Sequence, residues 1–259
     1  MAKPILGIQI HTVRNHFFNE DALKTLKDLK ALGYEAVEFV SEVMNKFTAP
    51  ELKAMLDEAG LICSSTTLSW NDVSPENIEK AMEYFGHIGC KNLVAGGAAP
   101  NDLKSRTKIK EIIKALNESN EIAKKAGFTL GYHAHAADFF MVDGVSSWDR
   151  IMQGTPQDFN MIIDTGNMLY MRAESEHYIN KYPGRTPIFH AKPFDKRISS
   201  GAVMFNEDSF NWPALIDLAI TKGGMKYLIA EYSNKNRFTP MEAAKLCCDQ
   251  LKEILEKYN

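Results

Sequence analysis

Ionisable residues stand at the ends of four successive apolar segments in the second half of the chain. They are His133 and His135 in GYHAH, Asp164 in IIDTGN, His190 and Lys192 in FHAK, and Glu231 in LIAEYS. Charged groups that converge at the end of a hydrophobic core are costly unless they are paired or bind an ion. A divalent cation would satisfy them, because two carboxylates balance its charge while neutral imidazoles complete the ligand shell.

The donor types favour a transition metal over magnesium. Mixed nitrogen and oxygen ligation suits Mn, Co, Zn or Fe(II) better than Mg. We therefore predict one divalent metal ion, held by His133, Asp164, His190 and Glu231. The alternative is a buried network of His–Asp and His–Glu ion pairs without a metal.

The elements that must position these residues alternate between short apolar runs and amphipathic helical patterns. We interpret the runs as strands: Leu6–Val13, Ala36–Val40, Ile62–Leu68, Asn92–Ala95, Thr129–His135, Asn160–Asp164, Ile188–Lys192 and Tyr227–Tyr232. Eight such units predict a (β/α)8 TIM barrel, a single domain over residues 1–259, with its active site at the C-terminal strand ends. An open doubly wound sheet is disfavoured because no G-x-G-x-x-G follows the first run.

Composition excludes several classes of partner. The formal net charge of -3 provides no basic field for phosphate backbones, so nucleic acid is not an expected partner. No apolar run approaches the ~18 residues of a membrane span, and the N-terminus lacks the apolar stretch of a signal peptide. We expect a cytoplasmic protein with four free cysteines, while a removed leader and a homo-oligomer stay open.

Several short motifs, in this order and spacing, resemble the xylose-isomerase-like TIM-barrel superfamily, the sugar phosphate isomerase/epimerase group. They are LGIQIHTVR, LKALGYEAVEFV, GYHAH, IIDTGN, GRTPIFHAKPFD and YLIAEYS, and GYHAH is similar to the YH-x-H segment of one branch. The resemblance implies one metal on strands five to eight, at the same four positions. Two departures matter: many members have Glu where this chain has His133, and the family's Lys-Asp reads Lys192-Pro193 here.

The resemblance implies abstraction of a proton alpha to a carbonyl of a small sugar, keto-sugar or sugar phosphate. The metal of such an enzyme stabilises the developing enediolate. The candidate catalytic residues are Glu231 as base, Lys192 as donor to the oxyanion, His135 as proton shuttle and Glu38 as second base. Each has a structural alternative: Lys192 pairs with Asp164 or Asp195, His135 orients a ligand, or Glu38 pairs with a Lys or Arg.

Five further residues are candidates for substrate binding. Gln9 and His11 share one face of the first predicted strand and suit hydroxyl recognition. Trp70 and Phe139 either stack on a sugar ring or pack in the core. Arg197, in the long loop after strand seven, either clamps a carboxylate or phosphate or is solvated.

Three other functions stay open beside an isomerase or epimerase. A lyase would eliminate water or an alcohol beta to the carbonyl of an oxidised sugar. The absence of one Glu favours it, because elimination needs one base and one acid. An apurinic endonuclease would need a multi-zinc cluster and a basic groove, against which the charge balance argues. A non-catalytic carbohydrate-binding barrel is the third, because barrel loops change function freely.

Overall fold

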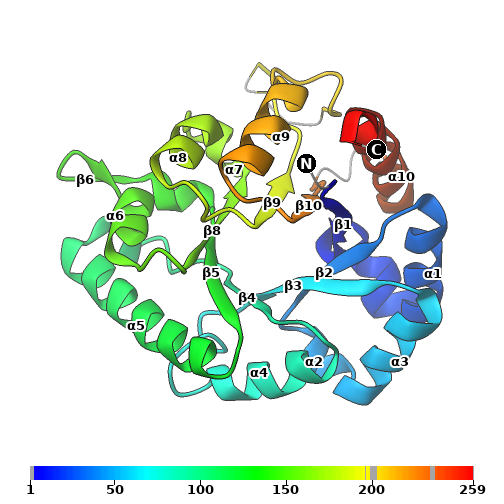
Figure 1. Ribbon diagram of the computed structural model, residues 1–259, viewed down its shortest axis with the longest axis horizontal. Helices are drawn as coiled ribbons and strands as arrows, with labels where there is room; N and C mark the ends of the chain where they lie inside the picture. The colour runs from blue at the N-terminus through cyan, green and yellow to red at the C-terminus, as the bar shows by residue number, and fades with distance from the viewer. Residues whose placement is uncertain (1–2, 196, 199–202, 234–236, 259) are drawn as a thin grey trace.

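The strands of the protein close into a barrel. The computed structural model describes residues 3–195, 197–198, 203–233 and 237–258. Within them, eight parallel strands pair in the closed order β1-β10-β9-β8-β5-β4-β3-β2, and helices surround them (Figure 1). The chain therefore folds as a (β/α)8 TIM barrel, which confirms the predicted fold class.

The barrel strands are short and parallel, as expected when helices connect them. They are β1 (Ile5–Gln9), β2 (Ala36–Val40), β3 (Ile62–Leu68), β4 (Asn92–Ala95), β5 (Thr129–His133), β8 (Asn160–Asp164), β9 (Ile188–Ala191) and β10 (Tyr227–Ala230). An antiparallel hairpin, β6 (Met141–Val142) and β7 (Val145–Ser146), is inserted between β5 and the next helix.

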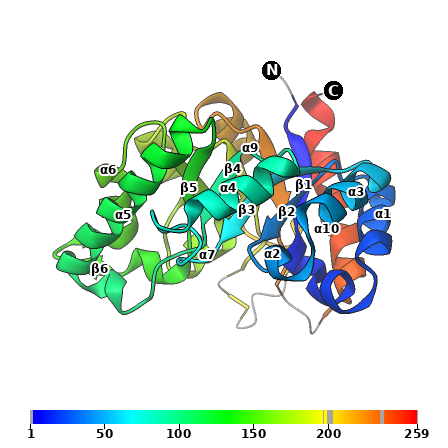
Figure 2. The same cartoon turned by 90° about the horizontal axis from the view of Figure 1, so that it is seen from below.

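Helices cover the outside of the barrel and fill the strand connections. They are α1 (Ala22–Leu32), α2 (Val43–Lys46), α3 (Ala49–Ala59), α4 (Ile78–His87), α5 (Arg106–Lys125), α6 (Ser147–Gly154), α7 (Thr165–Tyr170), α8 (Ser175–Lys181), α9 (Trp212–Thr221) and α10 (Pro240–Leu255). Short 3-10 helices span Ile10–Val13, Asp102–Lys104, Ala136–Phe139 and Glu256–Tyr258, and a π-helical turn spans His16–Glu20. Figure 2 shows α2, α7 and β6, which follow strands β2, β8 and β5 in the chain, toward the same edge.

Local sequence signals set the helix ends. Gly33 and Gly60 stop α1 and α3 with φ of 106° and 69°, a left-handed conformation that glycine adopts without steric cost. Thr239 begins α10 with a capping box, in which its hydroxyl accepts from the Glu242 N–H and the Glu242 carboxylate accepts from the Thr239 N–H.

An apolar layer fills the barrel below the polar rim. Val94, Ile162, Ile188 and Ile229 form a buried cluster of their own inside the strands. Two glycines make room for it: a Cβ on Gly131 would lie 2.3 Å from Ile162 Cδ1, and one on Gly7 would lie 2.7 Å from Ile229 Cδ1. The floor of the site is therefore apolar.

Four of the predicted strands were too long at their C-terminal ends. The structure ends the first at Gln9, the fifth at His133, the seventh at Ala191 and the eighth at Ala230. In the first case the Gln9 side-chain oxygen accepts the His11 N–H at 2.9 Å and caps the 3-10 turn that follows. In the fifth, the Asp138 carboxylate accepts the His135 N–H and begins the next turn. Polar side chains thus terminate strands whose apolar pattern continues.

Two predictions from composition are tested directly. All four cysteines are free and buried, as predicted. Within the described residues, no helix has the length and apolar character needed to cross a membrane.

Candidate metal centre

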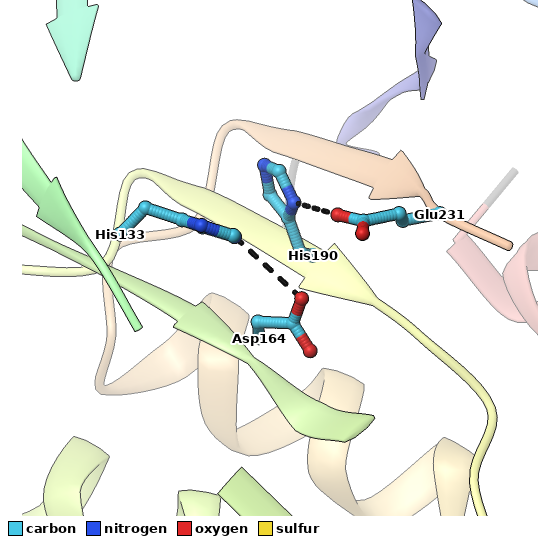
Figure 3. A group of neighbouring side chains, drawn as sticks. All are labelled: His133, Asp164, His190 and Glu231. Carbon is cyan, nitrogen blue, oxygen red and sulfur yellow. Dashed lines mark hydrogen bonds and ion pairs between the residues drawn. The ribbon is translucent and has the colours of Figure 1, made fainter. Parts of the chain in front are cut away.

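Four side chains from four adjacent strands meet at the C-terminal mouth of the barrel. His133 ends β5, Asp164 ends β8, His190 lies in β9, and Glu231 follows β10 directly. One nitrogen or oxygen atom from each lies within 4.8 Å of the others, and all four side chains are buried. Figure 3 shows them converging from neighbouring strands. The structure thus brings together the four ligands predicted from the sequence.

Several potential metal-ligand atoms in this cluster have no hydrogen-bond partner among the described residues. Among the described residues, both ring nitrogens of His133 and Oδ2 of Asp164 are buried without a hydrogen bond. The His133 Nε2 to Asp164 Oδ2 distance of 3.6 Å is too long for one. The other oxygen of Asp164 accepts the Asn167 N–H at 2.8 Å and caps α7, which directs Oδ2 toward the cluster. Unpaired buried lone pairs cost free energy, so this donor set fits a divalent metal ion.

The His190 ring is held between two carboxylates. Its Nδ1 lies 2.9 Å from Glu231 Oε2, and its Nε2 lies 3.1 Å from Glu38 Oε2. Burial alone would lower the pKa of His190, but the Glu38 and Glu231 carboxylates outweigh it and raise the pKa to about 10. In the metal-free protein the protonated ring therefore donates from Nδ1 to Glu231 and from Nε2 to Glu38. A metal ion would take the place of the Nδ1 proton, while Nε2–H would keep its bond to Glu38. This arrangement fixes the tautomer and orientation of a metal-binding histidine.

Glu38 is a positioning residue in this geometry. It is fully buried, and the Gln9 amide, the Ser65 and Thr67 hydroxyls and the His190 ring all donate to it. Its role as a second base stays a prediction, and these four hydrogen bonds to its two oxygens favour a structural role instead. The alternative of a Lys or Arg partner is wrong, since its charged partner is a histidine.

Lys192 joins the two carboxylates of the cluster. Its Nζ lies 2.8 Å from Glu231 Oε1 and 3.6 Å from Asp164 Oδ2, and it donates to Asn167 Oδ1 at 3.2 Å. Burial opposes the charge on Lys192, but the two carboxylates raise its pKa. Burial likewise opposes ionisation of Glu231, yet Lys192 and His190 hold the pKa of Glu231 well below its usual range. The site therefore contains a carboxylate and an ammonium in direct contact.

His135 lies beside the cluster as a neutral imidazole. Its ring meets the His133 ring edge-on at 4.6 Å between centroids. Burial and the neighbouring His133 lower its pKa to about 4. The backbone of His135 is anchored by Asp138, which also accepts a hydrogen bond from the Tyr132 hydroxyl at 2.7 Å. A neutral ring placed there can accept or relay a proton, as the sequence predicts, and its catalytic role stays a prediction.

The first pair of predicted substrate-binding residues separates in the structure. Gln9 is buried and points to Glu38, whereas His11 is exposed in the 3-10 turn Ile10–Val13. The prediction that they share a strand face is wrong, because the strand ends between them.

The other three predicted substrate residues mainly contact the protein. Phe139 is 6% exposed and packs against Trp148 and Tyr178, at centroid distances of 5.7 and 5.8 Å. Trp70 is half-buried against the core. Arg197 is exposed but pairs with the buried Asp195 of its own loop. Of the predicted roles for Phe139, core packing is the one that the structure supports.

Three residues of the site were missed from the sequence. Ser65 and Thr67 hold Glu38, and Asn167 bridges the Ala134 carbonyl to Lys192, donating at 3.0 Å to the former. The signal for the first two was the run Ser-Ser-Thr-Thr in β3, which is polar in a strand that must be buried. Residues two apart share a strand face, so Ser65 and Thr67 needed a common polar partner.

Comparison with known proteins places the geometry in context. The family model described as "Xylose isomerase-like TIM barrel" matches residues 26–254. Among solved structures, a sugar phosphate isomerase/epimerase from Parabacteroides distasonis is 20% identical with a TM-score of 0.82, covering 100% of this chain and 96% of the other. An L-ribulose 3-epimerase is 16% identical with a TM-score of 0.75, and the match covers 100% of this chain and 96% of the other. A 3-keto-D-glucoside 4-epimerase from E. coli is 16% identical with a TM-score of 0.67, covering 97% of this chain and 99% of the other. No curated protein matches by sequence.

Proposed function

The chain belongs to the xylose isomerase-like TIM-barrel family, and on that premise we propose that it is a metal-dependent isomerase or epimerase of a small keto-sugar or sugar phosphate. The solved structures it resembles include sugar isomerases and epimerases. The observation that carries the proposal is the cluster of His133, Asp164, His190 and Glu231, with ligand atoms within 4.8 Å at the barrel mouth.

The donor set supports Mn, Co, Zn or Fe(II) in preference to Mg, because two of the four ligands are imidazoles. A divalent ion held there would polarise a substrate carbonyl and its neighbouring hydroxyl, which would acidify the C–H of the hydroxyl-bearing carbon alpha to the carbonyl. His133 and Asp164 would supply their unpaired lone pairs, and Glu38 would hold the His190 ring in the ligating orientation.

We assign the proton transfers of the reaction to three residues of the chain. Glu231 is the proposed base, and its Oε1 must part from the Lys192 ammonium before it can take a proton from carbon. Lys192 is placed to donate to the oxygen on which negative charge develops. His135, neutral and edge-on to His133, is the proposed relay for the proton that returns.

A lyase is the second candidate, and one observation favours it. Two-base epimerisation needs a second carboxylate opposite Glu231, but His133 stands at that family position and Glu38 is engaged by four donors. What remains is one carboxylate beside one ammonium. This pair suits removal of a proton by Glu231 and delivery of another by Lys192 to a leaving oxygen beta to the carbonyl.

Metal content is the first test. Elemental analysis of the purified protein should find one transition-metal ion per chain, absent from His133→Ala and Glu231→Ala. His87→Ala, which removes an exposed imidazole on α4, is the matched control and should retain the ion. A wild-type protein that neither contains nor takes up Mn, Co, Zn or Fe would refute the proposal and leave the ion-pair network.

Proton exchange separates the two reactions. Keto-sugars and their phosphates, incubated with the metal-loaded protein in D2O, should gain deuterium alpha to the carbonyl without loss of water or alcohol. A lyase would instead release the beta substituent and form a conjugated enone that absorbs in the ultraviolet. Exchange that is equal in the wild type and Glu231→Ala would exclude Glu231 as the base.

A further inference from the structure

The ammonium of Lys192 lies beside the two carboxylates of the candidate metal centre. It contacts Glu231 Oε1 at 2.8 Å and approaches Asp164 Oδ2 to 3.6 Å, and these two residues supply both carboxylates of the four-residue cluster. The lysine side chain is 18% exposed, so its charge is only weakly screened by water. One protein cation thus lies close to both carboxylates that would hold the metal.

Contacts of its backbone and of its aliphatic stem fix the position of Lys192. Its backbone N–H donates to the Thr165 hydroxyl at 2.9 Å, and that hydroxyl donates to the Lys192 carbonyl at 2.8 Å. The stem then crosses Gly166, where an added Cβ would lie 2.8 Å from Lys192 Cγ and 3.0 Å from Cδ. Glycine at this position of α7 is therefore what lets the ammonium reach the carboxylates.

We infer that Lys192 is a built-in competitor of the metal ion. It holds Asp164 and Glu231 together in the metal-free protein and weakens metal binding to the same pair. The inference rests on the metal site of the proposed function. Its physical basis is that a divalent ion bound to Asp164 and Glu231 must displace the ammonium or bear its repulsion in a poorly screened site. Without Lys192, Asp164 would lose the ammonium that faces it in the metal-free protein, and Glu231 would keep only His190 as its charged partner among the described residues.

Lys192→Met tests this, because it removes the charge and keeps an unbranched apolar stem. Mn²⁺ affinity should rise by at least about tenfold, which corresponds to about 1.4 kcal/mol, because the variant removes the repulsion between the ammonium and a divalent ion at close range. The Tm measured in chelator should fall, so that the Tm gain on adding Mn²⁺ becomes larger. Lys24→Met is the matched control, because that lysine is exposed on α1 and pairs with Asp28 of the same helix; it should leave Mn²⁺ affinity unchanged.

Gly166→Ala is a second variant that retains the charge. Its added methyl group displaces the stem, so Mn²⁺ affinity should rise here too. Competition with a fluorescent chelator gives the affinity in each case. Equal or weaker Mn²⁺ binding by Lys192→Met would overturn the inference and make Lys192 a group that positions the ligands. If the wild type takes up no metal but Lys192→Met does, the inference stands and the proposed function fails. If neither binds any of Mn, Co, Zn and Fe, both fail.

Discussion

Glu38→Gln isolates the contribution of one buried carboxylate to the fold. Each Glu38 oxygen accepts two hydrogen bonds. Oε1 accepts from Gln9 Nε2 at 3.0 Å and Thr67 Oγ1 at 2.9 Å, and Oε2 accepts from Ser65 Oγ and from His190 Nε2 at 3.1 Å. Glutamine has the same shape but places an NH2 group at one of these two positions. It also removes the negative charge.

The size of the effect follows from which partners can adapt. The Ser65 and Thr67 hydroxyls can rotate and accept from the new amide, whereas the Gln9 amide nitrogen and the His190 N–H remain donors. One buried donor is therefore left facing another donor. His190 also loses one of its two carboxylates. Removing one member of a buried charged pair costs about 3–5 kcal/mol, and we expect the lower end, about 3 kcal/mol, because the hydroxyls adapt.

The assay is urea unfolding in the presence of a chelator, so that metal binding does not contribute. For a chain of this length the loss corresponds to a fall in Tm of about 6–12 °C, with the denaturant m-value unchanged. Glu58→Gln is the matched control, since its carboxylate is exposed and contacts Lys27 on the surface, and it should change little. A loss below about 1 kcal/mol in Glu38→Gln would refute the assignment of Glu38 as a structural anchor for His190.

Three further outcomes are expected. Burial raises the pKa of Asp138 to about 7 against the opposing hydrogen bonds from Tyr132 and His135, so the folded state favours its protonated form. The free energy of unfolding should therefore fall as pH rises from about 4 through about 7, and in Asp138→Asn urea unfolding should show this slope reduced. Gly131→Ala should cost about 1–3 kcal/mol in the same assay, because its Cβ would lie 2.3 Å from Ile162 Cδ1; an unchanged midpoint would contradict the packing. Mn²⁺ at a hundredfold excess over its Kd should stabilise the wild type by about 2.7 kcal/mol. In a thermal scan it should leave the Tm of His133→Ala unchanged.

The fold and the convergence of the four proposed ligands could be predicted because they depend on local patterns. Strand and helix periodicity identifies each βα unit, and the C-terminal ends of parallel strands meet at one face of a closed barrel. An Asp, a Glu and two His residues at four such ends must therefore lie near one another. Nothing beyond the order of the segments was required for this step.

The roles of Glu38 and Gln9 could not be predicted in the same way. Glu38 bonds to His190 across the barrel, 152 positions later in the chain, and no local pattern identifies partners that far apart. The error at His11 has a different cause. The apolar alternation of the first strand continues past Gln9, but the side chain of Gln9 accepts the backbone N–H of His11 and ends the strand. Phe139 and Arg197 show the same limit, since their contacts depend on how a loop folds back.

The bond between His190 and Glu38 also links metal capture to the order of folding. The proposed ligands come from β5, β8, β9 and β10, yet the ring of one of them is oriented by β2, which is separated from β10 by β1 and pairs with β3 on its other side. A partly folded chain in which β5 to β10 have assembled would hold all four proposed ligands, but the His190 ring would lack the hydrogen bond from its Nε2 to Glu38. Tight metal uptake during refolding should therefore lag behind helix formation and coincide with docking of β1 and β2. The metal then acts as a reporter of barrel closure.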